Sequence, residues 1–569
     1  MKSDDRLHGQ PDAAAPMQRG SRYVAEFFHA YGVTHVFFVP AILMEALADM
    51  EDLPIRRMMV HGEKAAAYMA DGYARASRRP GICMAQHIGA SNLAAGLRDA
   101  YLACSPVIAI TGGSTPLSRY RHAYQELEDL SQFDCTTKFN ARIDDVRRLP
   151  DLLRQAFREA TVGAPGPVHL QMQGHFAQVT EAAADLAMVV EERFRTVTPF
   201  RPAADSEAVR VAFDRLMTAR RPIIVAGGGV VWSDAGNELV TLAEKLQLPV
   251  ATSLNARGSI PDTHPLSLGL VGGYARACAN KAVAEADLVF FVGSRTGSQV
   301  TGNWKYPPAG SDIIHLDLDP SEIGRNYPAT PLLGDVRTVL SQLLAIDAPA
   351  AQPHRAAWLE RVQQMVKDWR REAAPKLNSD ALPIRPERVC AEISRALPEG
   401  GVVVCDTGHS GIWAGTMIDF TKPGQRLIRS AGSMGWGFPA ALGVKCALPD
   451  TPVICFTGDG AFYYHIAELE TAARYGINIV VVVNNNSALS QEIPLYEAGY
   501  RGRREKRARE MWAFNEIDFA KVAQSFGCLG VRVKHPSALA GSLEHALGAG
   551  RPVVIDVVTD HTVMGELSF

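Results

Sequence analysis

Short apolar runs alternate with amphipathic stretches along most of the chain. The runs predict buried β-strands, and the stretches between them carry the spacing typical of helices. Strands that alternate with helices are typical of α/β domains built on parallel sheets. The predicted strands span residues 36–39, 82–85, 107–111, 167–170, 222–226, 288–293, 313–317, 402–405, 452–457, 477–483 and 553–557.

These strands fall into three blocks, and we expect each block to form a doubly wound α/β domain with a parallel sheet. We assign residues 21–195 to a first domain, 200–350 to a middle domain and 381–569 to a third domain that ends in a C-terminal lid. Residues 1–20 are expected to form a flexible N-terminus, and residues 351–380 a linker with a helical stretch.

The composition narrows the class of protein. The 58 Lys and Arg residues nearly balance the 61 Asp and Glu residues, which argues against a nucleic-acid-binding protein. The nine cysteines form no Cys-x-x-Cys pair, so neither a zinc site nor a disulfide framework is expected. The first 20 residues lack a signal-type apolar core, and no apolar stretch is long enough to span a membrane. These features predict a soluble, cytoplasmic protein.

The strongest chemical signal follows the predicted strand 452–457. This strand runs into Gly458-Asp459-Gly460, and the next predicted strand leads into Asn484-Asn485-Asn486. A helix between two such strands makes a right-handed crossover, which places Asp459 and Asn486 at the carboxyl ends of parallel strands. A carboxylate and an amide oxygen suit Mg2+, which completes its shell with phosphate oxygens. The helix that follows Gly460 offers free N–H groups to the same phosphates. Taken alone, Gly458-Asp459-Gly460 also fits an ordinary turn, and the run of asparagines 484–486 an ordinary loop.

This motif resembles the diphosphate and Mg2+ motif of thiamine-diphosphate enzymes. The resemblance covers nearly the whole chain. The domains follow the order pyrimidine-binding, middle and diphosphate-binding, which is that of the group formed by acetolactate synthases, oxalyl-CoA decarboxylases and 2-hydroxyacyl-CoA lyases. It implies that Asp459, Asn486 and the backbone carbonyl of Ala488 hold the metal. Gly458, Gly460 and Ala461 would then adjoin the cofactor diphosphate.

Two further segments resemble cofactor-binding parts of this family. In the segment 431–440, the Gly432 carbonyl would meet the aminopyrimidine, and Met434 would lie beneath the thiazolium ring. A buried core position is the commoner fate of a methionine. The second segment, Gly408-His409-Ser410, resembles another diphosphate-binding loop.

Glu63 resembles the glutamate that activates the cofactor in this family, although relatives lack an intervening glycine such as Gly62 between the histidine and the glutamate. A carboxyl group that is hydrogen-bonded to a pyrimidine nitrogen promotes removal of the thiazolium proton. An exposed glutamate is the plain alternative. The resemblance implies that Glu63 and the metal site belong to different subunits, so a homodimer is the expected minimum and a homotetramer is favoured.

The middle domain carries glycine-rich turns after its predicted strands, at 227–229 and 293–297, and strand-end acids at 315–320. Such turns suit a nucleotide. Relatives hold ADP or FAD there or leave the site empty, and we favour ADP over FAD.

The substrate prediction depends on residues outside the cofactor motifs. His87 and Glu492 are candidate proton carriers, and Gln125 lies in a segment that resembles an active-site loop. The alternatives are that His87 is merely packed in the interior and that Glu492 is exposed on its helix. The basic run 501–509 suits the phosphates of coenzyme A, or else a solvated surface.

These features make the chain look more like 2-hydroxyacyl-CoA lyases and oxalyl-CoA decarboxylases than like synthases. This resemblance implies a lyase that cleaves a 2-hydroxyacyl-CoA to an aldehyde or ketone plus formyl-CoA. An acetolactate-synthase-like carboligase or a 2-oxo acid decarboxylase is the alternative enzyme. A catalytically silent homologue that binds the cofactor is the alternative of another class.

Overall fold

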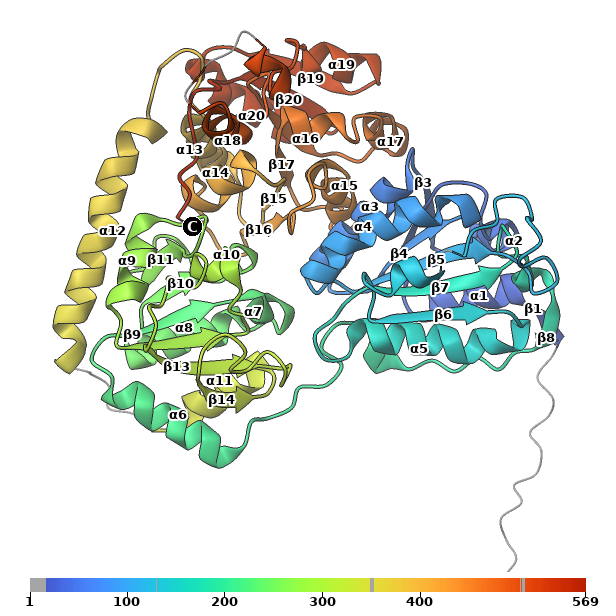
Figure 1. Cartoon of the computed structure of the whole chain (residues 1–569), viewed down its shortest axis with the longest axis horizontal. Helices are drawn as coiled ribbons and strands as arrows, with labels where there is room; N and C mark the ends of the chain where they lie inside the picture. The colour runs from blue at the N-terminus through green and yellow to red at the C-terminus, as the bar shows by residue number, and fades with distance from the viewer. Residues whose placement is uncertain (1–16, 129, 348–352, 502, 504–506, 569) are drawn as a thin grey trace, which may run out of the picture. The chain divides into compact units, whose positions relative to one another are not determined.

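The computed structural model describes residues 17–128, 130–347, 353–501, 503 and 507–568. These residues form three six-stranded sheets in which every strand pair is parallel, so the predicted fold class is confirmed (Figure 1). The chain divides into two compact units. One unit contains the first sheet, and the other contains the middle and third sheets together with residues 71–79 and 162–165.

The first sheet lies in the first unit, and its strands are covered by helices such as α1 (Gly20–Ala30) and α5 (Leu149–Thr161). A short strand, β1 (Met17–Arg19), pairs with β8 (Ala183–Asp185), so residues 17–20 of the expected flexible N-terminus lie in regular structure. Residues 1–16 lie outside the described residues. The strand order is β3 (Arg56–Met59), β2 (His35–Phe38), β4 (Gly81–Ala85), β5 (Val107–Gly113), β7 (Val168–Gln173) and β6 (Phe139–Ile143).

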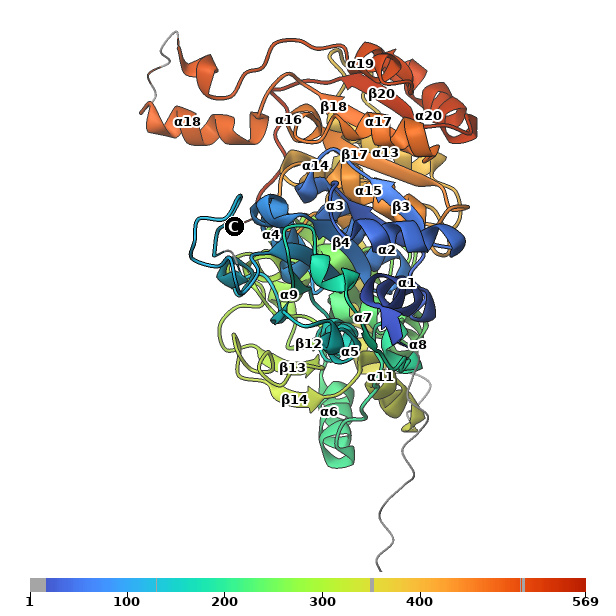
Figure 2. The ribbon, with the colours of Figure 1, turned by 90° about the vertical axis from the view of Figure 1, so that its right-hand side faces the viewer.

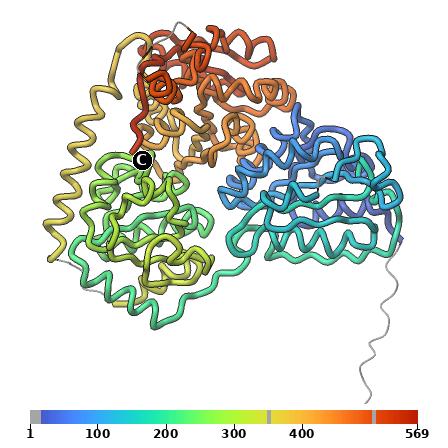
Figure 3. The backbone as a smooth tube through the Cα atoms, in the orientation of Figure 1, coloured from blue at the N-terminus to red at the C-terminus, as the bar shows by residue number. Residues whose placement is uncertain are grey.

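The middle sheet is packed on one side by helix α12 (Ala356–Leu377), which falls within the segment expected to be a linker. The helix buries Trp358, Val362 and Met365 in the same apolar cluster as the strands, and Figure 3 shows it running along the middle domain. The order of the strands in this sheet is β11 (Ser267–Leu270), β10 (Val250–Thr252), β9 (Pro222–Ala226), β12 (Leu288–Val292), β13 (Asp312–Asp317) and β14 (Thr330–Leu333).

The third sheet packs against α13 (Pro386–Ala396) and α20 (Leu539–Gly548), whose apolar side chains share one core cluster with its strands. Helix α18 (Ile493–Gly499) extends to one side of this sheet (Figure 2). The strand order is β16 (Arg426–Arg429), β15 (Val402–Cys405), β17 (Val453–Gly458), β18 (Val480–Asn485), β20 (Val553–Val558) and β19 (Leu529–Val533). None of the helices in the described parts of the chain has the length and apolar content needed to cross a membrane.

Each large sheet contains a topological switch point near the strand at which the chain enters it. The chain enters the three sheets at β2, β9 and β15, adds the next strand on one side and then crosses to the other side. The crossovers on either side of these strands cover opposite faces of the sheet, so a crevice opens at the carboxyl ends of the strands. The crevices lie between β2 and β4, between β9 and β12, and between β15 and β17.

A buried charge cluster joins the middle domain to the third domain. Asp262 is fully buried and accepts hydrogen bonds from the guanidinium groups of Arg257 and Arg276, each at 2.8 Å. Its second oxygen also accepts the backbone N–H of Phe420 at 2.8 Å, and Arg276 donates to Asp419 at 2.7 Å. Burial alone raises the pKa of Asp262, but the two guanidinium groups outweigh it and lower the pKa to about 2. The carboxylate is therefore charged and fully paired at neutral pH.

Replacing Asp262 with Ala should lower the free energy of unfolding by about 3–5 kcal/mol, because two guanidinium groups would remain buried without their carboxylate. Urea unfolding, followed by circular dichroism, measures the loss. The matched control is Asp368→Ala, which removes an exposed partner of Arg371 and should change the midpoint little. Equal midpoints for the two variants would show that the cluster does not stabilise the protein.

Candidate active site

Three loops meet at the carboxyl ends of β15, β17 and β18. The position that a Cβ would take on Gly458 lies 3.4 Å from Ser410 Oγ, and the same position on Gly408 lies 3.3 Å from Gln491 Oε1. Gly408 also has φ of +68°, a conformation that favours glycine. The glycines of the predicted diphosphate loops therefore leave open the space where these loops approach one another, at the crevice between β15 and β17.

Asp459 follows β17 and carries a buried carboxylate that is only half paired. Its Oδ1 accepts the backbone N–H of Gly460 at 2.8 Å, whereas the buried Oδ2 has no hydrogen-bond partner among the residues that the structure describes. Burial raises the pKa of Asp459 to about 6, although backbone N–H groups of residues 460 and 486–488 oppose the shift. A buried carboxylate oxygen without a partner is costly, and a bound cation would satisfy it.

Asn486 and Ala488 lie on the loop after β18, against the same carboxylate. The Asn486 side chain accepts the Ala488 N–H at 3.1 Å and donates to Ser490 Oγ at 3.0 Å. The Ser490 hydroxyl also lies 3.0 Å from His409 Nδ1. The structure thus brings the predicted metal residues together with the predicted loop 408–410. The fit of Mg2+ rests on this oxygen-rich donor set and on the unpaired Oδ2 of Asp459.

A residue that the sequence did not indicate fixes the predicted pyrimidine segment. Asp406 is buried, and its two oxygens accept the backbone N–H groups of Gly435 at 3.0 Å and Gly437 at 2.6 Å. These bonds hold the chain directly after Met434, which is half-buried. Gly432, with φ of +147°, is exposed and has no heavy atom within 4 Å of its Cβ position. Hydrogen bonds therefore hold residues 435–437, whereas the backbone at Gly432 faces open space.

A buried hydrogen-bond network around Asp556 holds the end of β18, next to Asn486. Asn485 donates to Asp556 Oδ1 at 2.8 Å, and Asp556 further accepts the Phe519 N–H and an Arg532 N–H, each at 3.0 Å. Asp556 is fully buried at the carboxyl half of β20, beside β18. This network restrains the residue next to Asn486, and sequence spacing gives no signal for it.

Glu63 lies in the first unit, where it begins helix α3 (Glu63–Ser77). Its Oε2 accepts a hydrogen bond from Asn92 at 3.1 Å. Its Oε1 lies only 2.7 Å from the position that a Cβ would take on Gly89, so a larger residue there would displace the carboxylate. Gly62 has open space around it and no positive φ, so it imposes no unusual geometry on the start of the helix.

His87 lies two residues before Gly89 and is 2% exposed. Its Nε2 lies 3.2 Å from the Leu127 carbonyl, which can only accept, so Nε2 carries the hydrogen in the neutral ring. Its Nδ1 then accepts from Nδ1 of His175 at 3.3 Å. Desolvation, followed by the effect of His87, lowers the pKa of His175. This geometry matches the packed alternative for His87, and a proton-carrying role stays a prediction.

The remaining predicted residues occupy different surroundings. Gln125 has φ of +62°, and its buried Oε1 has no partner in the described part of the chain. Glu492 is half-buried and directly precedes α18. In the basic run 501–509, residues 502 and 504–506 lie outside the described residues. The roles of Gln125, Glu492 and the basic run stay predictions.

The glycines of the middle domain have a structural explanation. A Cβ on Gly227 would lie 2.1 Å from the Gly293 carbonyl oxygen, and one on Gly229 would lie 2.7 Å from the Gly293 Cα. The loops that follow β9 and β12 therefore pack backbone to backbone at the crevice of this sheet. Binding of ADP or FAD at this crevice stays a prediction.

Comparison with known families matches all three domains. Residues 18–133 match the N-terminal thiamine pyrophosphate (TPP) binding domain of thiamine pyrophosphate enzymes, residues 209–343 their central domain, and residues 406–557 their C-terminal TPP binding domain. The chain is 33% identical, over 95% of its length and 92% of the relative's, to a probable acetolactate synthase large subunit of Methanocaldococcus jannaschii. It is 31% identical to acetolactate synthase isozyme 3 large subunit of Escherichia coli, over 96% and 95% of the two chains.

Replacing Asp459 with Asn should weaken Mg2+-dependent binding of thiamine diphosphate by on the order of tenfold or more, because the neutral amide removes the only buried charge of the donor set. Calorimetric titration of the cofactor at several Mg2+ concentrations measures the effect. The exposed Asp450→Asn variant is the matched control. An unchanged Mg2+ dependence in Asp459→Asn would place the metal elsewhere.

Proposed function

We propose that this chain, which belongs to the thiamine pyrophosphate enzyme family, is an acetolactate-synthase-like carboligase that joins two 2-oxo acids with loss of carbon dioxide. The observation that carries the proposal is similarity to acetolactate synthase large subunits along nearly the full length of both chains. The 2-hydroxyacyl-CoA lyase expected from the sequence has no such support. The basic run, one of the features on which that expectation rested, lies partly outside the described residues.

With pyruvate as the test substrate, two molecules and one proton would yield one acetolactate and one carbon dioxide. One carbon–carbon bond breaks in the pyruvate that loses its carboxylate, and one forms at the carbonyl carbon of the other. Thiamine diphosphate, when bound, supplies a thiazolium carbon that attacks a carbonyl after it loses its proton. The consumption of one proton per turnover makes the reaction measurable by pH-stat.

In this proposal the chain's own residues bind the cofactor and move protons. Asp459, Asn486 and the Ala488 carbonyl would hold Mg2+, and the loop 408–410 would lie against the diphosphate. Glu63 would hold a proton at its carboxylate and exchange it with the pyrimidine ring. Glu63 and Asp459 belong to separate compact units. Following the family resemblance, we propose a homodimer as the minimal active form, with a homotetramer favoured.

Replacing Glu63 with Gln should reduce turnover by roughly a hundredfold or more, because an amide keeps the shape of the side chain but cannot exchange the proton. Affinity for thiamine diphosphate should stay within a few-fold of the original value, since Asp459 and the diphosphate loops are unchanged. Carbon dioxide release and calorimetric binding measure the two quantities. The control is the exposed Glu181→Gln variant, and full activity of Glu63→Gln would show that the activating acid is another residue.

The substrate class can be tested directly with the purified protein, Mg2+ and thiamine diphosphate. We expect acetolactate and carbon dioxide from pyruvate, in a 1:1 ratio and without coenzyme A. Carbon dioxide with acetaldehyde instead of acetolactate would indicate a 2-oxo acid decarboxylase. Formyl-CoA from a 2-hydroxyacyl-CoA, with no turnover of pyruvate, would overturn the carboligase in favour of the acyl-CoA lyase.

A further inference from the structure

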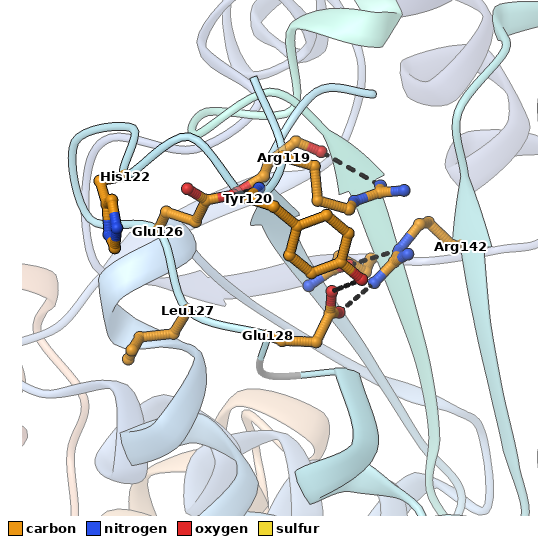
Figure 4. Close-up of a pocket in the computed structure, with 9 residues that line it drawn as sticks. Arg119, Tyr120, His122, Glu126, Leu127, Glu128 and Arg142 are labelled. Carbon is orange, nitrogen blue, oxygen red and sulfur yellow. Dashed lines mark hydrogen bonds and ion pairs between the residues drawn. The ribbon is translucent and has the colours of Figure 1, made fainter. Parts of the chain in front are cut away.

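A pocket of about 340 Å3 opens at the carboxyl ends of β5, β7 and β6 in the first unit (Figure 4). Ser114 follows β5, Gln171 belongs to β7 and Arg142 belongs to β6. The loop after β5 closes the pocket with Arg119 and Tyr120. The pocket shares no residue with the predicted cofactor or metal sites, although its lining residues Glu126 and Leu127 directly follow Gln125 in the chain. Its size is at the lower end of the range for small-molecule sites.

The acidic groups of the pocket are already paired within the protein. Glu126 accepts the backbone N–H groups of Tyr120 at 2.6 Å and Ala123 at 2.9 Å. Desolvation raises the pKa of Glu126. Hydrogen bonds from these and neighbouring backbone N–H groups lower the pKa by more, so it lies below its usual value. Glu128 accepts from Arg142 at 2.6 Å and from the Tyr120 hydroxyl at 3.3 Å. Both carboxylates therefore already accept hydrogen bonds from donors within the protein.

Two hydrogen-bond donors of the pocket, in contrast, lack short hydrogen bonds within the described residues. Within the described residues, the Arg119 guanidinium makes only long contacts, at 3.4 Å with the Ser114 carbonyl and at 3.6 Å with Asp144. The Ser114 hydroxyl is buried, with 8% of the residue exposed, and has no hydrogen-bond partner in the described part of the chain. Figure 4 shows the Arg119 and Arg142 guanidinium groups on the same side of the Tyr120 ring.

A buried hydroxyl without a partner beside an under-used guanidinium favours a bound anion. Arg119 and Arg142 carry two positive charges, and Glu126 and Glu128 carry two negative ones, so the lining has no net charge to hold a polyphosphate. A single carboxylate matches the planar fork of one guanidinium. We propose that this pocket is a second binding site for a small organic carboxylate, whose oxygens accept from Arg119 and Ser114. This site is additional to the proposed carboligase activity and does not depend on it.

The test is a ligand-observed NMR titration of the full-length protein, with Mg2+ and thiamine diphosphate present. The probe is 2-methylpropanoate, a carboxylate with no keto group to react. Arg119→Gln should weaken its binding about tenfold or more, since a charge-assisted hydrogen bond is lost. Ser114→Ala should weaken it a few-fold. The matched control is Arg121→Gln on the same loop, whose side chain is exposed and which should bind as the unmodified protein does.

Two other probes separate a carboxylate site from weaker alternatives. The neutral 2-methylpropanamide should not bind, and inorganic phosphate should not compete at equal concentration. Equal binding of 2-methylpropanoate to the unmodified protein and to Arg119→Gln would overturn the proposal, because the probe would then occupy another site. Stronger competition by phosphate would also overturn it. If Arg119→Gln fails to fold by circular dichroism, the comparison of Ser114→Ala with Arg121→Gln decides the result.

Discussion

The topological switch point in each parallel sheet is the constraint on which the candidate sites depend. Parallel strands need crossover helices, and where two crossovers cover opposite faces, the strand ends between them cannot be covered by either. Residues at those ends can then present polar groups to a ligand while the strands stay buried on both faces. The loops 408–410 and 458–460 follow the two strands that border this crevice in the third sheet, and the glycine turns of the middle domain occupy the equivalent place.

The third-sheet crevice contains two buried carboxylates that differ in how they are satisfied. Asp406 is saturated by backbone N–H groups and therefore stabilises the loop around it. One oxygen of Asp459 has no hydrogen-bond partner in the described part of the chain, and burial raises the pKa of this carboxyl. Its burial therefore destabilises the folded protein. Local violations of the rule that buried polar groups are paired concentrate at functional sites. The contrast separates a carboxylate that is paired within the protein from one that, among the described residues, leaves an oxygen available to a ligand.

The sequence predicted most of the central strands, but it missed the edge strands and the interior strand β10. The uninterrupted apolar run Val402–Cys405 was located correctly. By contrast, β3 begins with two arginines and β16 has an arginine at each end, so neither strand forms a clear apolar run. The strand predicted over 477–483 in fact begins at Val480, because pairing with β17 and β20 sets its start, although Ile477 is buried before it.

The candidate site was predictable where a motif carries its chemistry in consecutive residues. Gly458-Asp459-Gly460 and Asn486 do so, and the structure brings the loops that carry them together. Asp406 and Asp556 were missed because their partners are backbone groups and residues far along the chain, which leave no spacing pattern. His175 was missed because it follows β7 and His87 follows β4, two strands far apart in the chain that only the sheet brings near each other.

The buried cluster around Asp262 has a consequence for protein engineering. Arg257, Arg276 and Asp262 come from the middle domain, whereas Asp419 and the Phe420 backbone come from the third. A chimera that exchanges the middle domain for that of a relative would bring in unmatched charges at a dry interface, and each one would disfavour docking. Recombination breakpoints in this chain should therefore keep residues 257–276 and 418–420 from the same parent.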